Sequence, residues 1–185
     1  DLTDNFEDWY PTIVIWFLAL ALLLNYEDDR ILLGLKNRGL PGNLAISISV
    51  GLVVLFGAAG IFDPLNQRAV SLFVIGTLYN LSREIIKDVE DMDGDKGRHT
   101  YAMRVGADKA RLTSWVILLI TLVALLAPFA MGVFELLHII FLAPGLFTVM
   151  NVKKHIYLAE DTAASRMIKT SMTLTMIGLI LAAII

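Results

Sequence analysis

Side chains that could do chemistry gather in one short run of this sequence, residues 83 to 98. Four of its acids are spaced at i, i+4, i+7 and i+11: Glu84, Asp88, Asp91 and Asp95. If the run begins as a helix, this spacing puts all four carboxylates on one face. Like charges on one helix face repel each other by roughly 0.2–0.5 kcal/mol per neighbouring pair, and a bound cation reverses that effect. The spacing therefore predicts a cation site.

The residues around these acids indicate what else would bind there. Lys87 and Arg98 are interleaved with the acids, and an uncharged stretch, residues 69–82, leads into them. Gly94 and Gly97 allow the backbone to turn after the last helical acid. Mg²⁺ prefers one or two carboxylates, several waters and phosphate oxygens. Carboxylates, cations and an apolar wall together favour a site for a lipid diphosphate. The alternative is a solvated polar cap on a membrane helix that binds nothing.

The composition indicates an integral membrane protein. The chain has 185 residues, of which 57% are hydrophobic, and its mean hydropathy is +0.70. A soluble domain of this size is far less apolar. Cysteine is absent, which excludes disulfides and thiolate metal sites. The acidic start, residues 1–8, does not match the basic start of a signal peptide. Nucleic acid is not expected as a partner, because no basic patch or recognised motif is present.

Six apolar segments divide the chain, and they predict an all-α, polytopic transmembrane bundle of about six helices. Several approach the roughly 20 residues that a helix needs to cross a bilayer core. Pro128 and Pro144 are expected to kink or break the fourth and fifth segments. The segments are 8–27, 39–62, 69 into the acidic run, 112–134, 136–152 and 170–185.

The basic residues predict the orientation of the bundle. Alternate loops hold three, seven and four Lys or Arg residues, against one and none in the loops between them. By the positive-inside rule, the three basic loops face the cytoplasm and both ends of the chain face outward. We therefore expect a multi-pass protein of the cell membrane, with the acidic run on the cytoplasmic side.

The acidic run also resembles a family signature. Lys87-Asp88-x-x-Asp91-x-x-Gly94-Asp95 is similar to the second Asp-rich signature, KDxxDxxGD, of the UbiA superfamily of intramembrane prenyltransferases. The fuller run, residues 83–91, most resembles the archaeal digeranylgeranylglyceryl phosphate synthase branch. Residues 39–44 and the stretch 164–169, which leads into the final helix, are similar to other parts of that family. The resemblance covers residues from about 36 to the end of the chain.

The resemblance implies Mg²⁺-dependent transfer of a prenyl group from a polyprenyl diphosphate donor. For the archaeal branch the donor is geranylgeranyl diphosphate, and the lipid-like phosphate acceptor is geranylgeranylglyceryl phosphate. Membrane lipid surrounds both. The metal ligands carried over by position are Asp88, Asp91 and Asp95, and the residues implied in catalysis are Asp88, Asp91 and Lys87. The residues implied in substrate binding are Lys36, Arg38, Asn43, Arg83 and Arg98.

The chain departs from the family pattern in its first part. Family members have nine transmembrane helices and a first Asp-rich signature, NDxxDxxxD, after the second helix. Residues 25–29 have a similar composition but not that spacing. We therefore expect residues 1–185 to be a single transmembrane prenyltransferase domain that corresponds to the last six helices, without the first three. We expect this piece alone to be weakly active or inactive.

Two other functions remain open. The first is the same chemistry on an aromatic acceptor, as in quinone or chlorophyll biosynthesis. The second is a non-enzymatic cation transporter that uses the Asp cluster. A transporter would place acids near the middle of the membrane, where each costs at least about 2.5 kcal/mol. The acids of this chain are predicted at a helix end, which favours an enzyme.

Overall fold

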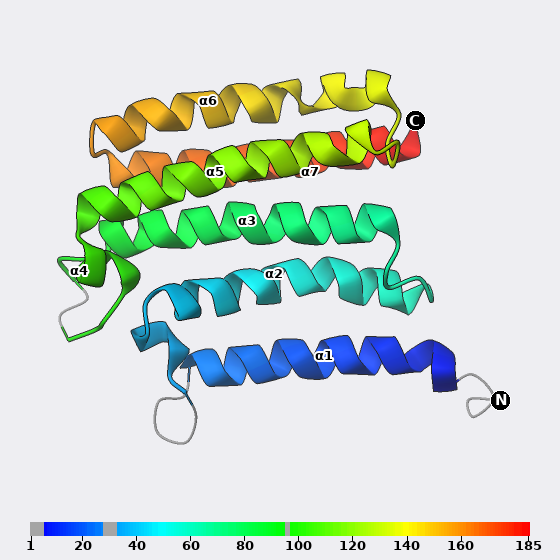
Figure 1. The fold of residues 1–185 in the computed structure, drawn as a ribbon, viewed down its shortest axis with the longest axis horizontal. Helices are drawn as coiled ribbons and strands as arrows, with labels where there is room; N and C mark the ends of the chain where they lie inside the picture. Colours follow the sequence, from blue (N-terminus) through cyan, green and yellow to red (C-terminus); the bar gives the residue numbers. More distant parts are fainter. Residues whose placement is uncertain (1–5, 28–32, 95–96) are drawn as a thin grey trace.

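The computed structural model describes residues 6–27, 33–94 and 97–185, and these residues form helices and connecting turns. Six helical segments are long and apolar enough to cross a membrane, as the sequence predicts. Successive long helices run antiparallel to each other (Figure 1). The elements are α1 (Phe6–Glu27), η1 (Leu35–Asn37), α2 (Leu40–Gly60), α3 (Gln67–Glu90), α4 (Tyr101–Val105), α5 (Ala107–Ala130), η2 (Leu136–Leu142), α6 (Ala143–Tyr157) and α7 (Asp161–Ile184).

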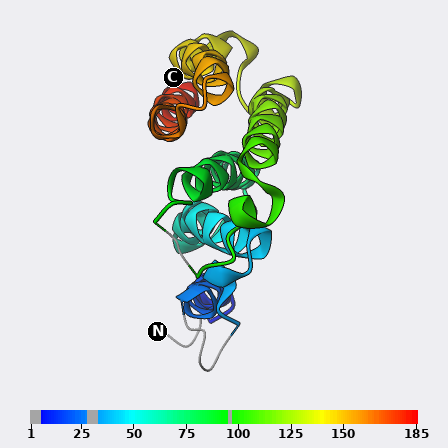
Figure 2. The same ribbon diagram turned by 90° about the vertical axis from the view of Figure 1, so that its left-hand side faces the viewer.

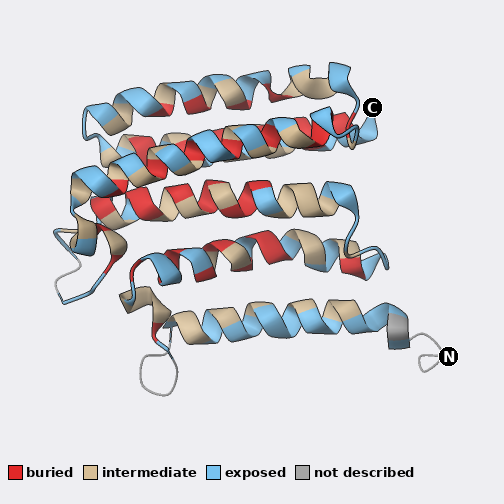
Figure 3. Cartoon of the chain, viewed as in Figure 1, coloured by how far each residue is buried: buried red, intermediate tan, exposed pale blue. Residues whose placement is uncertain are grey.

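Helix α3 lies at the centre of the bundle. It packs against α2, α5 and α7, whereas α1 contacts mainly α2, and α6 packs on α7. Seen end-on, α1, α2 and α3 form a row that divides into α5 on one side and α7 with α6 on the other (Figure 2). Half of the residues in the most apolar stretch of α3 are buried, whereas none are buried in the corresponding stretch of α1 (Figure 3). The acidic run therefore begins on the C-terminal part of α3, the best-packed of the six helices.

The three basic loops lie at one end of the bundle. The described parts of the α1–α2 loop, the α3–α5 loop and the α6–α7 turn are all at the left in Figure 1. The start of α1 and the end of α7 are at the opposite end. The alternation of basic and non-basic loops in the sequence thus corresponds to the two ends of the folded bundle.

Two helices begin well before the predicted residue. Helix α7 begins at Asp161 instead of residue 170, because Arg166 and Lys169 are exposed on the helix surface and do not end it. Helix α5 likewise begins at Ala107 instead of residue 112. The prediction ended each apolar segment at a charged residue, so it made both helices too short. Long charged side chains on a helix can extend into water, so a charge need not end the helix.

The two prolines occupy different positions in their helices. The fifth segment breaks at Pro144: η2 ends at Leu142, and Pro144 lies in the first turn of α6, where no hydrogen bond is lost. Pro128 lies inside α5, which continues to Ala130, and a kink there stays a prediction. Gly145 follows the break and lets α6 approach α7 closely, because a Cβ there would lie 2.2 Å from Thr175 Oγ1.

Buried hydroxyl groups connect α3 to its neighbours. Ser82 and Ser114 each donate a hydrogen bond of 3.0 Å to the other's carbonyl oxygen, which joins α3 to α5. The Tyr79 hydroxyl lies 3.1 Å from both Ser171 Oγ and Thr175 Oγ1 of α7. Such bonds between helices stabilise a membrane bundle, in which burial of apolar surface contributes little to helix association.

Candidate active site

The carboxylate of Asp88 lies where α2, α3 and α4 meet. Its Oδ2 accepts a hydrogen bond of 2.9 Å from the side-chain amide of Asn43, in the first turn of α2. The same oxygen accepts a bond of 3.2 Å from the backbone N–H of Tyr101, the first residue of α4. Asn43 is buried and Asp88 is half-buried. Two helix beginnings, from separate parts of the sequence, therefore orient one carboxylate of the predicted signature.

Two glycines allow the surrounding backbones to come this close. A Cβ on Gly42 would lie 2.2 Å from the carbonyl oxygen of Leu35 and 3.3 Å from the Cα of Lys36. Gly39 has a φ of +69°, and a Cβ there would lie 3.3 Å from the Cα of Tyr101. The start of α2 thus contacts the first basic loop through Gly42 and α4 through Gly39. This brings the backbone of Lys36 next to the turn that holds Asp88.

The backbone turns away directly after the second acid of the signature. Asp91 is the exposed C-cap of α3, and its carbonyl oxygen accepts a 3.0 Å bond from the N–H of Gly94. Gly97 has a φ of +94°, which a glycine tolerates and other residues avoid. The turn that the two glycines predicted is present. The third predicted ligand, Asp95, lies outside the described residues.

The basic residues predicted to bind substrate occupy different surroundings. Lys87 is exposed in the last turn of α3, and Arg38 is exposed directly after η1. The ammonium of Lys36 forms an ion pair with Glu27 at the end of α1. Arg83 forms an ion pair of 2.8 Å with Glu84, and its Nε is buried without a hydrogen-bond partner.

Sequence reasoning missed Tyr26, in the last turn of α1. The Tyr26 side chain is half-buried and close enough to Glu84, Asp88 and Arg98 to interact with them electrostatically. No spacing rule connects Tyr26 with Asp88, because they are on different helices and far apart in sequence. Arg98, predicted to bind substrate, is exposed and belongs to the same electrostatic neighbourhood.

The donor set has the chemistry that Mg²⁺ requires, but it is not a closed cage. Within residues 6–27, 33–94 and 97–185, no group of three or more His, Asp or Glu side chains could hold a metal ion. Mg²⁺ is usually bound in proteins by one or two carboxylates, with waters and substrate phosphates completing its shell. Asp88 and Asp91, three residues apart at the end of α3, fit this open type of site.

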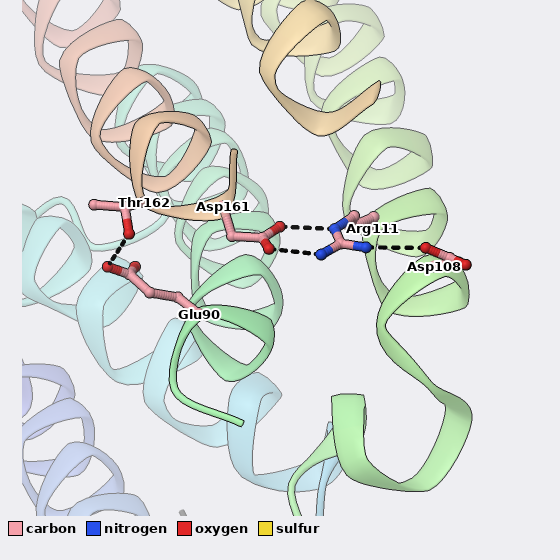
Figure 4. A network of polar contacts seen from close by, with 5 residues as sticks. All are labelled: Glu90, Asp108, Arg111, Asp161 and Thr162. Atoms are coloured by element: carbon pink, nitrogen blue, oxygen red, sulfur yellow. Dashed lines mark hydrogen bonds and ion pairs between the residues drawn. The ribbon is translucent and has the colours of Figure 1, made fainter. Parts of the chain in front are cut away.

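Two other acids of the run, Glu90 at the end of α3 and Asp93 after it, line a cleft that Asp88 does not line. Glu90 accepts a 2.8 Å bond from the Thr162 hydroxyl in the first turn of α7. Beside it, Arg111 of α5 binds both carboxylate oxygens of Asp161 at 2.8 and 2.7 Å (Figure 4). The cleft at this place has a volume of about 720 Å³. Its lining includes Glu90, Asp93, Arg111, Glu160, Asp161 and Arg166, but not Asp88. The acidic run is therefore divided between two sides of one helix.

Comparison with protein families identifies the family to which this chain belongs. The model of the UbiA prenyltransferase family matches residues 10–177, almost the whole chain. The chain belongs to the UbiA prenyltransferase family. Membership agrees with the resemblance of residues 87–95 to the second UbiA signature, and with a multi-pass helical bundle.

Several similar UbiA proteins carry the same name. The chain is 34% identical over 137 residues to a digeranylgeranylglyceryl phosphate synthase of Haloquadratum walsbyi, covering 72% of this chain and 46% of that protein. A protein of the same name from Korarchaeum cryptofilum is 30% identical over 195 aligned residues, covering 93% of this chain and 67% of that protein. One from Methanosarcina mazei is 40% identical over 108 residues, covering 57% and 37%.

The matched region is a part of each relative. The chain spans about half the length of several curated relatives: 46% of the Haloquadratum walsbyi protein and 56% of a protein of the same name from Halobacterium salinarum. No solved structure matches the chain significantly.

Proposed function

We propose that this chain forms part of a Mg²⁺-dependent prenyltransferase. The reaction is transfer of a geranylgeranyl group from geranylgeranyl diphosphate to the free hydroxyl of geranylgeranylglyceryl phosphate, a step of archaeal ether-lipid synthesis. The observation that carries the proposal is the Asp88 carboxylate, which two neutral donors orient at the end of an apolar helix. The name shared by the relatives supports the choice of donor and acceptor.

The residues at this end of the bundle have distinct parts in the proposal. Asp88 and Asp91 would hold the magnesium ion, with Asp95 as a third ligand. The backbone of Lys36 lies beside Gly42, in the turn that carries Asn43. The Lys36 ammonium would bind the donor's diphosphate. Glu27 now pairs with Lys36, and a diphosphate carries more negative charge than one carboxylate, so the donor would displace it. Further candidate cations for phosphate groups are Arg38, Arg83, Lys87 and Arg98.

The proposed reaction exchanges one C–O bond for another. The bond between C1 of the donor and its diphosphate oxygen breaks, and the electron pair stays on pyrophosphate. The acceptor's hydroxyl oxygen bonds to C1 and releases its proton to water or pyrophosphate. A bound magnesium ion would stabilise the negative charge that develops on the leaving group. The cations of the loops, Lys36 among them, would act on the same charge.

The apolar surroundings suit both substrates and the reacting carbon. Burial contributes about 0.8 kcal/mol per CH₂ group, so a C20 chain belongs among lipid-facing helices and not in water. Exclusion of water from the breaking C–O bond also prevents hydrolysis in place of transfer. The acids lie at the end of α3 and not at its middle, so the charged groups would meet the diphosphate where apolar helix and water meet.

Product analysis tests this function. The protein expressed from its complete reading frame is incubated with Mg²⁺, geranylgeranyl diphosphate and one acceptor, either geranylgeranylglyceryl phosphate or an aromatic quinone precursor. We expect a diether phospholipid by mass spectrometry, and no product when Mg²⁺ is chelated. Prenylation of only the aromatic acceptor would replace the substrate assignment. Absence of transfer to either acceptor, with ion flux into vesicles, would favour a transporter.

We also place the acidic end on the cytoplasmic side of the cell membrane, on the basis of the positive-inside rule. The chain contains no cysteine, so single cysteines can report the orientation cleanly. Tyr157 ends α6, Leu65 lies in the α2–α3 loop, and both are exposed. The end of α6 and the α2–α3 loop lie at opposite ends of the bundle (Figure 1). A membrane-impermeant maleimide should label Leu65→Cys from outside intact cells and Tyr157→Cys only after lysis. The reverse pattern would contradict this orientation.

A further inference from the structure

Asn43 contacts a carboxylate, although the resemblance assigns it to substrate binding. Its side chain is 8% exposed, and its amide nitrogen lies 2.9 Å from Asp88 Oδ2. The backbone N–H of Tyr101 donates to the same oxygen. Two donors that converge on one oxygen restrict the rotation of the carboxylate about its χ angles. The direction of the Asp88 side chain is therefore set from α2 and α4, and not by α3 alone.

A second layer of polar contacts holds Asn43 in place. The Ser47 hydroxyl donates a 2.6 Å bond to the carbonyl oxygen of Asn43, within α2. The side-chain amide of Asn80, two turns before Asp88 on α3, donates to the Ser47 hydroxyl at 3.3 Å. All three supporting groups are buried. The chain Asn80–Ser47–Asn43–Asp88 begins and ends on α3, so it fixes the rotation of α2 against the helix that carries the signature.

The geometry points to Asn43 as a positioning residue for Asp88, which acts on the orientation of this carboxylate towards a divalent cation and not on the substrate. This inference rests on the proposed function, because it assumes that Asp88 is a metal ligand. Partners that orient a metal ligand typically account for 10–100-fold in metal affinity or activity. An amide donor suits the task, because it fixes the carboxylate and leaves its negative charge unchanged.

The test measures metal binding directly. The protein from the complete reading frame is titrated with Mn²⁺ in the presence of inorganic pyrophosphate, and binding is followed by electron paramagnetic resonance. Asn43→Ala should raise the dissociation constant for Mn²⁺ by about 10–100-fold. Ser49→Ala is the matched control, because Ser49 is also buried on α2 but bonds only to Ala45 of its own helix. It should leave the dissociation constant unchanged within about twofold.

A double-mutant comparison separates positioning from a general structural role. If Asn43 acts through Asp88, then Asn43→Ala should lower the residual turnover of Asp88→Asn by no more than about twofold. If Asn43→Ala does not fold, Asn43→Leu keeps a similar volume without the amide and replaces it.

The outcomes distinguish this inference from the proposal beneath it. A folded Asn43 variant that binds Mn²⁺ like the wild type overturns the inference, as does a full additional loss of turnover in the Asp88→Asn background. Asp88→Asn with wild-type Mn²⁺ binding and turnover overturns the role of Asp88 in the proposed function, and the inference with it. Loss of Mn²⁺ binding in Asp88→Asn but not in Asn43→Ala overturns the inference alone.

Discussion

Two polar clusters lie on opposite sides of the C-terminal end of α3, and they are built differently. On one side, Asp88 accepts hydrogen bonds from the Asn43 amide and the Tyr101 backbone. On the other, the Arg111 guanidinium binds Asp161 through two bonds and Asp108 through a third, at 2.9 Å. Residues two apart on a helix project in nearly opposite directions, so Asp88 and Glu90 of one short run belong to different clusters.

The difference lies in how the acids are satisfied. In the Arg111 cluster a cation neutralises the carboxylates, and the bidentate geometry joins α5 to α7. In the Asp88 cluster the Asn43 amide and the Tyr101 N–H are neutral donors, and they fix the direction of the carboxylate. The first arrangement is an ion pair between helices, and the second orients a carboxylate that we propose as a metal ligand. We place the site beside Asp88 because its carboxylate is oriented in this way and matches the family signature, although the cleft of about 720 Å³ lies beside Glu90.

The largest effect should come from the acids of the signature itself. Asp91→Asn should lower Mg²⁺-dependent turnover about 100-fold or more, because it removes a proposed ligand at the end of α3. Asp93→Asn is the matched control: Asp93 is also exposed, two residues further on, but it lines the cleft on the Glu90 side. It should retain turnover within about threefold. Equal losses in both variants would mean that only local charge matters, and the distinction between the two sides would fail.

A smaller effect, on stability and not on metal dependence, should follow from the Arg111 cluster. Arg111→Met keeps the apolar stem but leaves Asp161, largely buried, without its cation. We expect the free energy of unfolding to fall by about 1–3 kcal/mol, measured in detergent micelles. The Mg²⁺ concentration for half-maximal turnover should not change. Asp108→Asn should leave the unfolding midpoint unchanged within error, since that carboxylate is 99% exposed. If Arg111→Met shifts the Mg²⁺ dependence, the Arg111 cluster is part of the metal site, and the separation of the two clusters is wrong.

The smallest effect is expected far from both clusters, in the bundle interior. Tyr79→Phe removes the hydroxyl that bonds to Ser171 and Thr175 and should lower stability by about 0.6–1.7 kcal/mol, the range for such bonds between membrane helices. Tyr157→Phe is the comparison variant, because Tyr157 is exposed in the α6–α7 region. Thermal midpoints of the two variants test this. Equal midpoints would show that the Tyr79 hydroxyl contributes nothing.

Much of the fold could be predicted from the sequence because hydropathy and basic loops are local signals. The six segments, the break at Pro144 and the gathering of the basic loops at one end were all predicted. The start of α7 at Asp161 was not, because exposed charges such as Arg166 look like loop residues in a linear reading. Only the packed structure shows that these side chains point away from the bundle.

The candidate site was predictable in part. The spacing of Asp88 and Asp91 identified the acidic end of α3, and Gly94 correctly predicted the turn that follows. The contacts of Asn43 and Tyr26 with Asp88 or its neighbours could not be predicted, because they join residues on different helices. Likewise, no sequence pattern connects Arg111 with Asp161, fifty residues away. The roles of Asp88, Asp91 and Asp95 as metal ligands stay predictions.

The most direct test of the account is turnover by Asp88→Asn. An asparagine offers a carbonyl oxygen that can accept both bonds now made by Asp88 Oδ2, from Asn43 and from Tyr101, but it carries no charge. The substitution therefore removes the charge and keeps the local structure. We predict that Mg²⁺-dependent geranylgeranyl transfer falls about 100-fold or more while the unfolding midpoint changes little. Turnover within threefold of the wild type would contradict the account, because Asp88 would then be only an anchor for α4.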